Sequence, residues 1–170
     1  MPYEAADRQP VGARSRLDAD TLDALRAFLA ERREPAADQT DDRVCEPPAG
    51  LAAYLARAGV PFSRLLLEHI RSSGSSEVEI YKRAHVDRKL FSKIRSDPGY
   101  QPKKVTVIAF ALALRLSLEQ TRDLLASAGY ALSGSAPFDL IIRFFVEREV
   151  FDLFQINDAL DTFGQPILMV

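Results

Sequence analysis

Between Lys82 and Lys104 the chain carries eight Lys or Arg residues against two Asp, in a protein of 170 residues whose formal net charge is −2. This segment therefore carries a charge of +6, and the rest of the chain carries −8. Positive charge concentrated in one segment of an acidic protein indicates a surface that binds an anion, most often phosphate. The chemistry expected of these residues is electrostatic recognition.

The side chains of Asp87–Ser96 separate onto two faces when the segment is drawn as a helix. Leu90, Phe91 and Ile94 share one face, and the opposite face is basic and polar. Long basic side chains on such a face can reach guanine edges in the major groove, and a serine hydroxyl can serve either donors or acceptors. The residues predicted to contact bases are Arg88, Lys89, Ser92, Lys93 and Arg95. The residues predicted to contact phosphates are Lys82, Lys103 and Lys104.

Two helices must position these side chains. Ser76 and Glu79 have the spacing of a capping box, which predicts a helix over residues 76–84. Asp87 is a good N-cap for the basic helix, which is expected to end before the Asp-Pro-Gly run at residues 97–99.

Only His85 and Val86 separate the two predicted helices, and Val86 is expected to point from this turn into the core. The spacing is typical of a helix-turn-helix, in which the first helix braces against the DNA backbone and the second enters the major groove. Lys103 and Lys104 begin the next predicted helix, where oriented backbone N–H groups add to their charge and favour phosphate.

The remaining sequence predicts an all-α fold, because helical apolar spacing recurs and no stretch alternates with a period of two. Residues 103–117 are apolar almost all round, which predicts the central buried helix. Further helices are expected at 20–34, 51–59, 62–74, 117–129, 137–149 and 152–164. We expect a compact multi-helix bundle that contains the helix-turn-helix and has a flexible N-terminal arm.

Three regions follow from these patterns. Residues 1–50 are expected to be a disordered or helical arm with a linker, 51–132 the helix-turn-helix core, and 133–170 a C-terminal helical extension packed on that core. The helix at 20–34 either belongs to a mobile arm or docks on the main domain or on a partner. The C-terminal QPILMV either packs back on the bundle or completes a dimer interface.

The run EIYKRAHVDRKLFSKI, followed by VTVIAFALALRLS and SLEQTRDLL, resembles the helix-turn-helix of phage-repressor-type (Cro- and XRE-like) regulators. The resemblance covers about residues 62–127 and implies a five-helix DNA-binding domain. Two positions depart from that family. It usually has a small residue where Tyr81 stands and glycine where His85 stands, so His85 is expected to adopt a left-handed conformation.

A longer resemblance is carried by PFSRLLLEHI, YKRAHVDRKLFSKIRSDPGYQPKK, FALALRLSLEQTRDLLASAGYALS, and FDLIIRFF through FGQPIL. Over residues 61–168 the chain is similar to an uncharacterised bacterial helical module that is sometimes found C-terminal to ADP-ribose-processing macrodomains. This resemblance implies a fold and no activity.

Other functional classes have little support in the sequence. Cys45 is the single cysteine, and His69 and His85 lie 16 residues apart without a third ligand in a motif spacing, so no metal site is expected. No phosphate-binding glycine loop or nucleophile motif is present, so we expect neither an enzyme nor a cofactor. No signal peptide or membrane span is evident, which makes a cytoplasmic protein the expectation.

The sequence therefore predicts a protein that binds double-stranded DNA, as a transcriptional regulator or accessory factor. One alternative of another class remains. Residues 133–170 carry a net charge of −4, so an acidic-to-basic contact could make the chain a helical protein–protein interaction module of the adaptor, death-like type. In that case the C-terminal helices would contact a protein partner or a second copy.

Overall fold

The computed structural model describes residues 17–31 and 59–168, which form eight α-helices and, within these ranges, no strand. The helices are α1 (Ala19–Glu31), α3 (Phe62–Ser73), α4 (Glu77–Arg83), α5 (Arg88–Ser96), α6 (Lys104–Ala113), α7 (Leu118–Ser127), α8 (Pro137–Glu147) and α9 (Leu153–Thr162). The predicted all-α class is confirmed. The predictions for residues 1–16, the linker at 35–50 and most of the helix at 51–59 lie outside the described residues.

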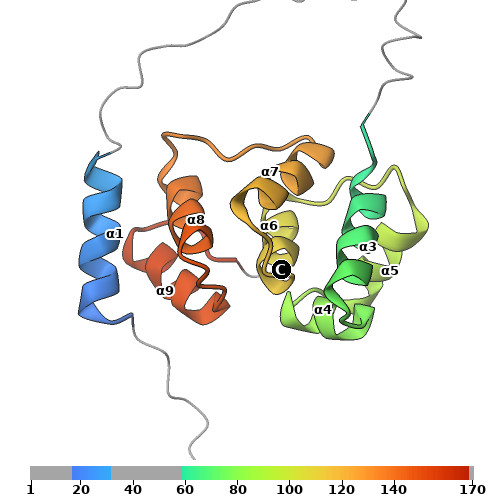
Figure 1. Cartoon of the computed structure of the whole chain (residues 1–170), viewed down its shortest axis with the longest axis horizontal. Helices are drawn as coiled ribbons and strands as arrows, with labels where there is room; N and C mark the ends of the chain where they lie inside the picture. Colours follow the sequence, from blue (N-terminus) through green and yellow to red (C-terminus); the bar gives the residue numbers. More distant parts are fainter. Residues whose placement is uncertain (1–16, 32–58, 169–170) are drawn as a thin grey trace, which may run out of the picture.

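Helix α6 is the centre of the hydrophobic core, as its sequence predicts. Eight of its ten residues are buried. The ring of Phe110 on α6 lies 6.4 Å from that of Phe62 on α3 and 6.0 Å from that of Phe91 on α5. Helices α3 and α5 are thereby fixed on one side of α6, while α8 and α9 belong to the same hydrophobic cluster (Figure 1).

Helix α1 docks on the C-terminal part of the bundle. Leu25 is fully buried, and the ring of Phe28 meets that of Phe144 on α8 edge to face at 5.3 Å. Of the two alternatives for this helix, a mobile arm or a docked helix, the structure therefore shows docking on the main domain for residues 17–31. Figure 1 shows α1 and α5 at opposite ends of the long axis, so α1 does not cover the basic helix.

The end of the described chain also packs back on the bundle. Leu168 is buried, and its backbone N–H donates to Asn157 Oδ1 on α9 at 2.7 Å. Of the two alternatives for QPILMV, packing on the bundle or completing a dimer interface, the structure therefore shows packing on the bundle as far as Leu168.

Three helices end in the same strained way. His85, Arg115 and Glu149 follow α4, α6 and α8 with φ near +55°, a conformation that favours glycine. In each case the next N–H bonds to the carbonyl five residues earlier, as from Leu116 to Ala111 at 3.0 Å, which closes the helix. This closure explains why α6 ends at Ala113 although its apolar sequence continues.

We expect Arg115→Gly to stabilise the protein by about 0.5–1 kcal/mol. Glycine removes the left-handed strain, and the greater freedom of the unfolded chain offsets part of the gain. The matched control is Arg122→Gly within α7, which is expected to cost about 1 kcal/mol because that residue is helical. Urea unfolding of both variants measures the two effects, and a destabilised R115G protein would contradict the strain.

Candidate nucleic-acid interface

Helix α4 begins with the capping box predicted from its sequence. Glu79 N–H donates to Ser76 Oγ at 3.2 Å, and Ser76 N–H donates to Glu79 Oε2 at 2.9 Å. At its other end, Arg83 Nη1 donates to the carbonyl oxygen of Ala113 at 3.1 Å. This bond joins the last turn of α4 to the last turn of α6 and holds that end of α4 against the core.

The capping box makes α4 sensitive to acid. The backbone N–H and then the hydroxyl of Ser76 bond to the carboxylate and hold the pKa of Glu79 below its ordinary value. Because the pKa is lower in the folded state, this contribution to stability is complete above the unfolded pKa of about 4.3 and is lost as the pH falls below it.

We expect Glu79→Gln to reduce the loss of stability between pH 7 and pH 3. A glutamine keeps the capping bond at neutral pH, as Gln120 does in the capping box of α7, but it has no carboxylate to protonate. The measurement is the free energy of unfolding in urea at both pH values for the two proteins. An identical acid sensitivity in both would show that Glu79 is not its source.

The turn between α4 and α5 has the geometry expected from its residues. His85 has φ +54°, and Val86 is buried with its N–H bonded to the carbonyl of Tyr81 at 2.9 Å. Tyr81, where the resembling family has a small residue, packs its ring against Phe91 at 5.5 Å. The large side chain thus fills the space between the two helices and joins the core.

Helix α5 is capped and oriented as predicted. Asp87 Oδ1 accepts the N–H of Lys89 at 3.3 Å, and Phe91 and Ile94 are 4% and 1% exposed. Leu90 is half-buried. The side chains that remain exposed on the outer side are Arg88, Lys89, Ser92, Lys93, Arg95 and Ser96.

Arg95 and Lys104 differ from the other predicted contact residues because each has a partner within the chain. Arg95 Nη1 lies 3.1 Å from Glu77 Oε2 at the start of α4. Lys104 Nζ lies 2.7 Å from Asp139 Oδ2 on α8. By contrast, the other five predicted contact cations are exposed and have no ion pair with any described residue. These are Lys82, Arg88, Lys89, Lys93 and Lys103.

The acidic residues around α4 and α5 are all occupied. Glu77 binds Arg95, Glu79 completes the capping box, and Asp87 caps α5. Asp97 accepts the N–H of Gly99 at 3.0 Å in the turn that ends α5. At this end of the molecule, cations without an ion-pair partner therefore outnumber carboxylates without a partner. The electrostatic potential in front of α5 is consequently positive.

The loop after α5 brings a further cation toward the helix. Lys93 Nζ lies 4.7 Å from the centre of the Tyr100 ring, a cation–π contact. Lys103 follows three residues later, so its Cα is within about 11 Å of that of Tyr100. Lys103 is exposed at the N-cap of α6 and provides no side-chain capping bond. The N-cap of α6 therefore offers its first N–H groups no side-chain acceptor, and the N–H of Thr106 bonds to the carbonyl of Lys103 at 3.0 Å.

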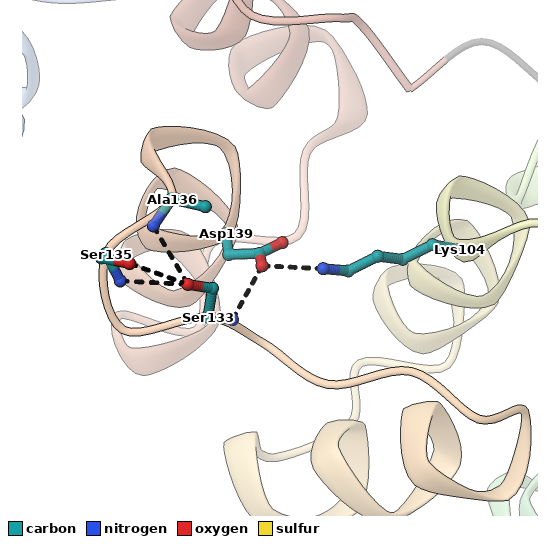
Figure 2. A network of polar contacts seen from close by, with 5 residues as sticks. All are labelled: Lys104, Ser133, Ser135, Ala136 and Asp139. Atoms are coloured by element: carbon teal, nitrogen blue, oxygen red, sulfur yellow. Dashed lines mark hydrogen bonds and ion pairs between the residues drawn. The ribbon is translucent and has the colours of Figure 1, made fainter. Parts of the chain in front are cut away.

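Sequence reasoning missed the role of Asp139. This carboxylate is 2% exposed, and its Oδ2 accepts both Lys104 Nζ and the backbone N–H of Ser133 at 2.7 Å (Figure 2). Asp139 Oδ1 is buried without a hydrogen-bond partner. Lys104 thus joins α6 to α8 through a partly buried ion pair, a contact that no local pattern indicates because the two residues are 35 positions apart.

The acidic C-terminal region is less uniform than its net charge suggests. Asp139 is inside the protein, Glu147 pairs with Arg143 at 2.6 Å, and Asp152 caps α9 through the N–H of Phe154. Half of the six carboxylates between residues 133 and 170 are therefore already engaged. This distribution weakens the case for an acidic surface that would receive the basic helix of another copy.

Within residues 17–31 and 59–168, no three His, Cys, Asp or Glu side chains are grouped as they would need to be to hold a metal ion. None of the described helices is both long and apolar enough to cross a membrane. Comparison of the chain with protein-family models, with curated proteins and with solved structures found no match. The functional inference therefore depends on the geometry of the basic surface.

Proposed function

We propose that the protein binds double-stranded DNA, with α4 and α5 acting as a helix-turn-helix and α5 entering the major groove. The observation that supports this proposal most strongly is that the exposed cations of α5 lack ion-pair partners. Arg88, Lys89 and Lys93 are exposed and have no ion pair in the described part of the chain, whereas the neighbouring acidic side chains are engaged in caps or pairs.

The arrangement of α5 suits groove recognition. One side of α5 is buried, and the opposite, exposed side carries Arg88, Lys89, Ser92 and Lys93. A short turn connects this helix to α4. Arginine and lysine can bind the O6 and N7 acceptors of guanine, and Ser92 can donate or accept. These four residues are the proposed base-contacting set. We leave Arg95 out of it because Glu77 occupies its guanidinium.

Phosphate contacts are proposed for Lys82 and Lys103. Both are exposed cations without ion-pair partners among the described residues. Lys103 adds the backbone N–H groups at the start of α6, which favour an anion. Lys104, by contrast, is proposed to be a structural residue that holds α8, because its ammonium is bound to Asp139.

Gel-shift titration with random-sequence duplex and single-stranded pools tests the proposal, and we expect retardation of the duplex. Lys103→Ala should then weaken binding about equally for all sequences and reduce the slope of log K against log [salt] by about one, because one phosphate contact is lost. A change in sequence preference would contradict the phosphate role of Lys103. Failure of the unmodified protein to retard any duplex at low salt would overturn the proposed function.

A further inference from the structure

A second concentration of positive charge lies beside α5, at a cavity of about 440 Å³ between α3 and the end of α5. Its lining includes Ser63, Arg64 and Arg71 from α3, together with Arg95 and Pro98. None of the proposed base- or phosphate-contacting residues belongs to the lining. The volume is within the range of small-molecule sites.

Three arginines and one acidic residue line this cavity. Arg71 has no ion pair with any described residue. Arg64 is held only at 3.4 Å by Glu68, the one acidic residue of the lining, and Arg95 is shared with Glu77. The lining therefore has a net positive charge, and planar guanidinium groups match the oxygens of a phosphate.

The start of α3 provides hydrogen-bond donors to the same cavity. Its N-cap is Pro61, which forms no side-chain capping bond, so the N–H groups of Phe62 and Ser63, the first two of this 12-residue helix, have no acceptor within the helix. Ser63 is 6% exposed and lines the cavity, and its hydroxyl has no hydrogen-bond partner among the described residues. The hydroxyl is therefore free to donate a hydrogen bond to an acceptor bound in the cavity.

We propose that this cavity binds a phosphate group. The helix N-terminus and the Ser63 hydroxyl would donate to its oxygens, and Arg71 would neutralise its charge. The phosphate belongs either to a small phosphorylated molecule or to the backbone of a nucleic acid. This inference uses residues other than the contact set of α5, so it can fail while the proposed DNA contacts stand.

The test is titration of the ¹⁵N-labelled full chain with inorganic phosphate, with chloride at matched ionic strength as the reference. We expect saturable shifts of the Ser63 amide and of its α3 neighbours with phosphate alone. Ser63→Ala and Arg71→Ala should each weaken phosphate binding about tenfold, since each removes one charged or charge-assisted hydrogen bond. The matched control, Arg122→Ala on α7, removes an exposed arginine outside the cavity and should leave the affinity unchanged.

A second titration, with a duplex oligonucleotide, distinguishes the two sources. A duplex that shifts the Ser63 amide and displaces inorganic phosphate assigns the site to a nucleic-acid backbone. If phosphate still binds the duplex-saturated protein, the site takes a small phosphorylated molecule. Phosphate shifts that are absent from α3, that chloride reproduces, or that persist unchanged in both S63A and R71A proteins would overturn the proposal.

Discussion

Lys89→Glu is expected to lower the affinity for duplex DNA by at least about tenfold, and by about a hundredfold if Lys89 forms a bidentate contact with guanine. The substitution replaces an exposed cation that has no ion pair in the described ranges by an anion facing the phosphates. Competition fluorescence anisotropy at fixed salt measures the change.

Lys89 is the most informative position because its substitution does not weaken the helix. It is the second residue of α5, and a carboxylate in the first turn interacts favourably with the helix dipole. Lys93 is less suitable, since its ammonium also contacts Tyr100. The matched control is Arg122→Glu, the same change in charge on the exposed side of α7. Equal losses in the two variants would indicate an effect of net charge alone and would exclude α5 as the binding surface.

Asp139→Ala is expected to destabilise the fold by about 3 kcal/mol. The change leaves the half-buried ammonium of Lys104 and the N–H of Ser133 without their acceptor. Breaking a buried ion pair costs about 3–5 kcal/mol, and the 29% exposure of Lys104 places the effect toward the lower end of that range. Urea unfolding gives the change in free energy.

The control on the same helix is Glu147→Ala, which breaks the pair with Arg143. Both of those side chains are about 27–28% exposed, so we expect a loss below about 1 kcal/mol. The double variant Lys104→Met/Asp139→Leu should recover part of the stability lost in Asp139→Ala, because no charge is left unpaired. Similar losses for Asp139→Ala and Glu147→Ala would contradict the role assigned to the buried pair.

Features that depend on neighbouring residues could be predicted from the sequence. The capping box at Ser76 forms because the required side chains are three positions apart, and Ser117 and Gln120 have the same spacing at the start of α7. The burial of Phe91 and Ile94 follows from helical spacing. The left-handed conformation of His85 follows from the resemblance to a family that has glycine at that position.

Features that depend on distant pairing could not be predicted. Arg95 pairs with Glu77, 18 positions away in the sequence, and Lys104 pairs with Asp139, 35 positions away. The distribution of charge along the sequence therefore suggested that both cations were available to a ligand. The end of α6 at Ala113 could not be predicted either. Arg115 adopts the left-handed conformation at a position where a glycine would have indicated the end of the helix. Tertiary packing determines which charges stay exposed and where an apolar helix ends.

The central claim is that the outer face of α5 lies against DNA. Its most direct test is the ¹⁵N–¹H spectrum of the full chain titrated with a random-sequence duplex at low salt. We predict amide shifts across Arg88–Lys93 and at Lys103, no shifts on α8 and α9, and reversal of the shifts as salt is raised. A duplex that leaves α5 unperturbed, or that shifts only α8 and α9, would contradict the account.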